Sequence, residues 1–150
     1  MSNITLRAYT DADEGLVVEL WRRTWQRAYP KIDFAVRVPW WRARLRAMQK
    51  NRIAIVLAER AGAIIGFVTV DPESHYLDQM LVAPEAQGSS AAQQLMAEAK
   101  CISPTGLILR VNQDNERAIR FYERSGFVCV AEEQNSNSGN LVYSMIFVGN

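Results

Sequence analysis

The sequence predicts an α/β (α+β) fold, in which a mixed sheet of six to seven strands carries about four helices on its two faces. Short consecutive strands in the N-terminal half favour antiparallel pairing, and strand–helix–strand crossovers follow in the C-terminal half. With 150 residues, 49% hydrophobic and 22% charged, the chain suits one compact domain, residues 1–150. This composition excludes a disordered or fibrous protein.

The N-terminal half begins with weak alternation that predicts a strand over residues 3–8. Apolar residues at helical spacing then predict a helix between Thr10, a suitable N-cap, and Pro30. Pro39 opens a second helix that extends to about residue 48. Three strands follow, the first two as a hairpin: residues 53–59, 64–70 and 75–83.

The C-terminal half begins with a polar loop at residues 84–89. Apolar residues at i, i+3, i+4 and i+7 then predict a helix over residues 91–100. The remaining elements are a buried strand, a helix and two final strands: residues 106–111, 115–125, 127–131 and 141–147.

Charge and cysteine content narrow the function classes. The 17 Lys and Arg residues nearly balance 16 Asp and Glu residues, so no global field attracts nucleic acid or an anionic membrane. The start of the chain has no signal-peptide pattern and no apolar run could span a bilayer, which predicts a cytoplasmic protein without a membrane partner. Cys101 and Cys129 lack metal-site spacing, and His75 is the single histidine, so we expect no metal.

The segment at residues 81–96 leads a strand through a loop of small residues into an amphipathic helix. Main-chain N–H groups and the positive end of a helix favour a bound anion at such a place. The segment lacks the glycine and lysine pattern of dinucleotide and nucleoside-triphosphate loops. An ordinary turn, with Ser90 and Gln93 as a capping box, explains it equally well.

The segment at residues 115–127 places Asn115 and Tyr122 on one helix face, seven residues apart. Gly126 fits the left-handed position just past the helix end, with Phe127 folding back onto the last turn. Taken alone, this pattern is typical of a capped amphipathic helix that buries a tyrosine.

Together the two segments resemble the motifs of the GNAT superfamily of acyl-CoA-dependent N-acyltransferases. Gln87-Gly-Ser-Ser-Ala-Ala92 is similar to Gln/Arg-x-x-Gly-x-Gly/Ala, with Ser90 where the family usually has Gly. The second segment matches Asn-x-x-Ala-x-x-Phe-Tyr-x-x-x-Gly-Phe at every motif position. The resemblance implies a GNAT-like, mostly antiparallel sheet, with acetyl-CoA (coenzyme A) as co-substrate and no metal.

The resemblance also implies roles for the matched residues. Loop amides would bind the coenzyme pyrophosphate, Asn115 would contact the pantetheine arm, and Tyr122 would act as general acid toward the thiolate. Main-chain N–H groups at residues 80–82 would stabilise the developing oxyanion. The expected coenzyme contacts are Met80, Leu81, Val82, Gln87, Gly88, Ser89, Ser90, Ala91, Ala92, Gln93, Asn115 and Tyr122.

A general base is expected on the strand before Met80, because GNAT enzymes often place an acid or histidine there. This position selects Asp78 first, accepting a proton through water, and Tyr76 second. A carboxylate that only holds the strand end explains Asp78 equally well. His75 would face away in a regular strand.

We therefore predict an N-acetyltransferase that moves an acetyl group from acetyl-CoA to a primary amine of a small molecule or peptide by direct attack. One alternative is a non-catalytic acyl-CoA sensor, motivated by Ser90. Another is a nucleic-acid-binding module, since ten of the 17 cations and several tryptophans lie in or beside residues 22–52. The sequence leaves the amine acceptor open, and exposed final strands would permit a homodimer.

Overall fold

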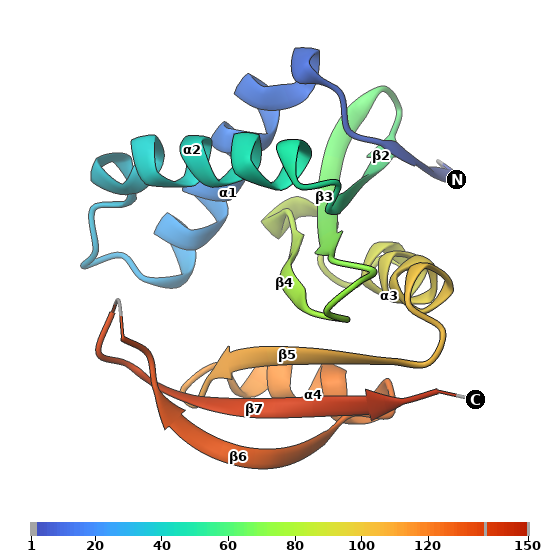
Figure 1. Cartoon of the computed structure of the whole chain (residues 1–150). Helices are drawn as coiled ribbons and strands as arrows, with labels where there is room; N and C mark the ends of the chain where they lie inside the picture. Colours follow the sequence, from blue (N-terminus) through green and yellow to red (C-terminus); the bar gives the residue numbers. More distant parts are fainter. Residues whose placement is uncertain (1–2, 137, 150) are drawn as a thin grey trace.

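The computed structural model describes residues 3–136 and 138–149 (Figure 1). Within them, seven strands and four α-helices confirm the predicted α+β fold. The elements are β1 (Ile4–Ala8), α1 (Glu14–Ala28), α2 (Val38–Lys50), β2 (Ala54–Arg60), β3 (Ala63–Val70), β4 (Leu77–Val82), α3 (Ala91–Ile102), β5 (Gly106–Asn112), α4 (Glu116–Arg124), β6 (Val128–Gln134) and β7 (Leu141–Val148). Short 3-10 turns precede α1, α2 and α3: η1 (Asp11–Asp13), η2 (Phe34–Arg37) and η3 (Pro84–Ala86).

The strands form two antiparallel sheets, where the sequence predicted one mixed sheet. One sheet has the order β1-β2-β3-β4 and the other β5-β7-β6. Among the described residues, β4 and β5 meet at a single parallel bridge between Tyr76 and Ile108, where the Ile108 N–H donates to the His75 carbonyl at 2.9 Å. Beyond this bridge the two strands separate, as Figure 1 shows.

A β-bulge at Asp78 accompanies the separation. Leu77 pairs with Val70 and Gln79 pairs with Thr69, so Asp78 has no partner on β3. A bulge bends its strand and increases the local twist. We attribute to it the turn that carries the end of β4 away from β5.

Aromatic side chains build the core beneath α1 and α2, which pack on one face of the first sheet, while α3 packs on the other (Figure 1). Trp41 is fully buried and stacks on Trp21 at 5.5 Å and on Phe67 at 5.9 Å between ring centroids. Trp21 and Trp41, which lie in or beside the basic region of residues 22–52, are therefore core residues. Helix α4 covers the second sheet, where Tyr122 and Phe127 belong to the same continuous core.

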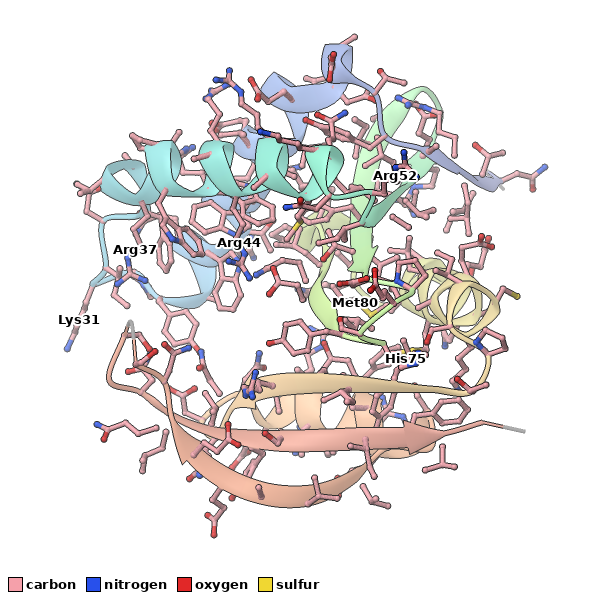
Figure 2. All side chains as sticks on the ribbon, in the orientation of Figure 1. Lys31, Arg37, Arg44, Arg52, His75 and Met80 are labelled. Atoms are coloured by element: carbon pink, nitrogen blue, oxygen red, sulfur yellow. The ribbon has the colours of Figure 1, made fainter. Side chains whose placement is uncertain are left out.

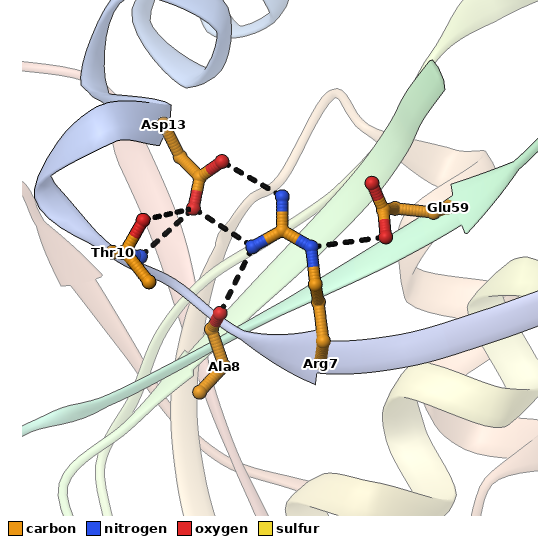
Figure 3. Close-up of polar contacts among 5 residues, drawn as sticks. All are labelled: Arg7, Ala8, Thr10, Asp13 and Glu59. Carbon is orange, nitrogen blue, oxygen red and sulfur yellow. Dashed lines mark hydrogen bonds and ion pairs between the residues drawn. The ribbon is translucent and has the colours of Figure 1, made fainter. Parts of the chain in front are cut away.

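Arg7 ties β1 to the start of α1 and to β2 (Figure 3). Its guanidinium donates to the two oxygens of Asp13 at 2.7 and 2.9 Å and to Glu59 at 2.9 Å. Asp13 also accepts hydrogen bonds from the main-chain N–H and hydroxyl of Thr10. The Arg7 guanidinium, together with Thr10, holds the pKa of the buried Asp13 carboxyl well below its usual range.

Candidate functional site

A cleft of about 540 Å³ lies between α1, the end of β4, the β4–α3 loop and α4. Its walls include every coenzyme contact predicted from the sequence except Ser90 and Ala91. The residues brought together are Met80, Leu81, Val82, Gln87, Gly88, Ser89, Ala92, Gln93, Asn115 and Tyr122. Two segments separated by 22 positions, from Gln93 to Asn115, therefore share one cavity.

The loop from β4 to α3 depends on a glycine. Gly88 has φ +88°, a left-handed conformation that other residues rarely adopt. Ser90, the N-cap of α3, has φ −81°, so a serine fits there without strain. The predicted capping box between Ser90 and Gln93 is wrong, because the Ser90 hydroxyl instead accepts a hydrogen bond from Gln94 Nε2 at 2.8 Å.

The same loop presents unpaired main-chain donors. Within the described part of the chain, the N–H groups of Gly88, Ser90, Ala92 and Gln93 have no hydrogen-bond acceptor. The first N–H groups of an α-helix cannot bond inside the helix, and the helix dipole makes this end positive. These amides can therefore bind an anion, which is the chemistry that a coenzyme pyrophosphate requires.

Three arginines also line the cleft, and one of them contacts the β4–α3 loop. Arg27, Arg117 and Arg124 all line the cavity, and Arg117 donates a hydrogen bond to the side-chain oxygen of Gln87. Guanidinium groups bind phosphate oxygens in bidentate fashion. The residues present thus fit a phosphate-bearing ligand, with positive charge beside the unpaired amides.

Helix α4 contributes Asn115 and Tyr122. The Asn115 Oδ1 accepts a hydrogen bond from the Ala118 N–H at 3.3 Å and caps the helix, which leaves its Nδ2 group for a ligand. Gly126 has φ +98°, as the sequence predicted, and the following N–H of Phe127 donates to the Tyr122 carbonyl at 3.0 Å. This turn fixes the Phe127 ring edge-on to Tyr122 at 5.7 Å.

The Tyr122 side chain is buried at 8% exposure, and its hydroxyl forms no hydrogen bond with other described residues. Burial raises the pKa of Tyr122 to about 12. The phenol therefore stays protonated at neutral pH and has a proton to donate within the cleft.

Asp78 is not among the residues that line this cleft. Both of its oxygens accept hydrogen bonds from Arg44 of α2, at 2.6 and 2.8 Å. Asp78 and Tyr76 line a second cavity of about 220 Å³, under α2. The imidazole of His75 lies elsewhere, with Nδ1 2.7 Å from the Ser103 hydroxyl.

Two polar groups of α1 were missed by sequence reasoning. Thr24 and Trp25 line the cleft, and the buried Thr24 Oγ1 and Trp25 Nε1 atoms have no partner among the described residues. Trp25 lies in the apolar stripe of its helix, so its spacing indicated only a core residue. Burying a polar atom without a hydrogen-bond partner is costly, so these two atoms mark a locally unfavourable part of the cleft wall.

The basic stretch at residues 22–52 is not a uniform cationic surface. Five of its ten cations are held in ion pairs with carboxylates: Arg22, Arg23, Arg42, Arg44 and Arg46. Figure 2 shows Lys31 and Arg37 together at one end and Arg52 well apart from them near β2. These positions weaken the argument for a nucleic-acid-binding face.

In residues 3–136 and 138–149, no group of three or more His, Cys, Asp or Glu side chains is placed to hold a metal ion. Over the same residues, no helix is both long and apolar enough to span a membrane.

Residues 32–146 match the family described as "Acetyltransferase (GNAT) domain". The chain is 30% identical over 116 residues to the peptidyl-lysine N-acetyltransferase YiaC of Escherichia coli strain K12, covering 74% of each chain. It is 27% identical over 85 residues to the peptidyl-lysine N-acetyltransferase YjaB of Salmonella typhimurium. That second match covers 53% of this chain and 57%, little more than half, of its relative.

Solved structures share the fold over nearly the whole chain. One is the PaiA N-acetyltransferase of Thermoplasma acidophilum, solved with coenzyme A, with a TM-score of 0.77 at 19% identity. The match covers 97% of this chain and 99% of the PaiA chain. Apo YjaB of Escherichia coli has a TM-score of 0.73 at 18% identity, covering 99% of both chains. Given the family match and these relatives, the chain belongs to the GNAT family of acetyltransferases.

Proposed function

We propose that residues 1–150 act as one GNAT domain that transfers an acetyl group from acetyl-CoA to a primary amine of a small molecule or peptide. The observation that carries this proposal is the cleft whose wall includes both the β4–α3 loop with its unpaired amides and the largely buried side chain of Tyr122. Peptidyl-lysine is the first acceptor to test, because two relatives bear that activity in their names.

In this proposal the loop amides and neighbouring arginines hold the coenzyme phosphates, and Asn115 binds the arm that follows. Bound acetyl-CoA supplies an activated thioester. Main-chain N–H groups at residues 80–82 then stabilise the oxygen of the acyl carbonyl as it gains negative charge. The separation of β4 from β5 supports this role, because it leaves the end of β4 without a strand partner on that side.

Two protons must move during the transfer. An alkyl ammonium has a pKa of about 10.4, and only the neutral amine attacks. As the carbon–nitrogen bond forms and the carbon–sulfur bond breaks, Tyr122 gives its proton to the departing sulfur. The amine passes its proton through a bridging water to Asp78. Each oxygen of that carboxylate keeps a lone pair beyond the one that accepts from Arg44.

The test combines binding with turnover. Acetyl-CoA should raise the unfolding temperature, and a panel of lysine peptides and small amines should release free thiol with at least one acceptor. Binding without thiol release for every amine supports the acyl-CoA sensor. Salt-dependent binding to DNA or RNA that acetyl-CoA does not change supports the nucleic-acid module.

A further inference from the structure

Arg44 is held firmly beside β4 by contacts on two sides. Its Nε and Nη2 atoms donate to Asp78 at 2.8 and 2.6 Å, and its guanidinium carbon lies 5.5 Å from the centre of the Trp40 ring. Figure 2 shows the side chain extending from α2 toward β4. A guanidinium fixed from two sides loses little conformational freedom when it binds a further group.

The fixed guanidinium still has an unused side. Its Nη1 atom has no hydrogen-bond partner among the described residues, and Arg44 keeps 39% of its side chain exposed. Asp78 raises the pKa of Arg44, so the group stays cationic at every working pH. A cationic donor with free N–H groups and a fixed orientation is suited to a carboxylate.

The surroundings have the size for a small polar ligand that carries both signs of charge. The cavity of about 220 Å³ is lined by the cation Arg44 and by two carboxylates, Asp71 and Asp78. Met80, two residues beyond Asp78, already lines the coenzyme cleft, and two strand residues span about 7 Å. A molecule in this cavity would therefore lie beside the reaction site, near the start of β4, whereas the coenzyme loop follows the other end of that strand.

We propose that Arg44 binds a carboxylate of the amine acceptor, so that the enzyme prefers amines that carry a carboxylate close to the reacting nitrogen. The inference rests on the proposed acetyl transfer. The negative carboxylate of Asp78, which contacts Arg44, would attract the ammonium group of the same molecule. Both a free amino acid and a lysine beside an acidic residue in a peptide have this chemistry.

Matched acceptors test the preference with the wild-type enzyme. One arm compares L-lysine with L-lysinamide, and the other compares a blocked peptide containing Asp-Lys with the same peptide containing Asn-Lys. We expect kcat/KM for thiol release to be about 10- to 100-fold higher for the carboxylate member of at least one pair. The pair that responds identifies the source of the carboxylate.

The Arg44→Lys variant shows which side chain is responsible. A lysine keeps a positive charge beside Asp78 but cannot bind two carboxylates in a fork, so the preference should fall to within about threefold of unity. Arg46→Lys, on the same helix and paired with Glu14, is the matched control and should keep the preference. Thermal unfolding of both variants confirms that they fold.

Equal kcat/KM within both pairs, measured while thiol is released, would overturn the role of Arg44 and leave the acetyl transfer intact. A preference that survives in Arg44→Lys would also overturn it. Absence of thiol release with every amine would instead contradict the proposed function itself.

Discussion

Replacing Tyr122 by Phe removes one hydroxyl from the cleft and little else. The hydroxyl has no hydrogen-bond partner among the described residues, so we expect the free energy of unfolding to change by less than about 0.5 kcal/mol. The ring contacts with Phe127 at 5.7 Å and with Phe121 at 5.7 Å do not require the oxygen. Coenzyme affinity should therefore change by less than about threefold.

The rate should respond much more strongly. A positioned general acid contributes about 10²- to 10⁴-fold, so kcat should fall by that factor, or about 3–5 kcal/mol in the barrier. Because burial raises the pKa of Tyr122 to about 12, the phenol does not ionise between pH 6 and pH 10. The wild-type rate should show no loss from tyrosine ionisation over that range.

The assay measures free thiol released from acetyl-CoA at saturating amine, with coenzyme affinity measured separately by calorimetry. Tyr143→Phe is the matched control, because Tyr143 lies on β7 and lines neither cavity, so its rate should equal that of the wild type. A Tyr122→Phe enzyme with kcat within threefold of the wild type would refute the general-acid role. A large loss of coenzyme affinity would show that the hydroxyl acts in binding instead.

Substitutions at four further residues test other parts of the structure. Asp78→Asn should lower kcat for thiol release by at least about tenfold, and an unchanged kcat would rule out Asp78 as the base. Asp13→Asn should lower the free energy of unfolding at pH 7 by about 1–2 kcal/mol. Since the folded pKa of Asp13 is depressed, its contribution is present above about pH 3.9 and is lost as the pH falls below it, so chemical denaturation should show a smaller difference in acid. In Gly88→Ala the added methyl group has no atom within 4 Å, but alanine is strained at a φ of +88°. Calorimetry should therefore show coenzyme binding weaker by about 1 kcal/mol. Trp41→Ala should lower the free energy of unfolding by about 3–5 kcal/mol, because it removes a fully buried ring. Trp41→Phe should lower the free energy of unfolding by clearly less, because it keeps a ring and removes a buried Nε1 donor that has no partner among the described residues.

The features that the sequence predicted well are local. The helix that begins after Ser90 and the turn at Gly126 depend on residues within a few positions of each other, so spacing and residue type are sufficient to identify them. The spacing of Asn115 and Tyr122 likewise fixes them on one face of one helix. The wrong capping box at Ser90 shows the limit, because a neighbouring glutamine competed for the same hydroxyl.

The sequence by itself thus determined the order of elements, the membership of the family and the two segments that form most of the cleft. Only the tertiary structure decided that β4 bulges at Asp78, that Arg44 pairs with that carboxylate from 34 residues away, and that Trp25, a residue of the cleft wall, has a buried donor with no partner among the described residues. The physical reason is the range of the interactions. Helix ends and turns are set by neighbouring residues, whereas a pairing register or an ion pair between distant elements exists only once the chain has packed.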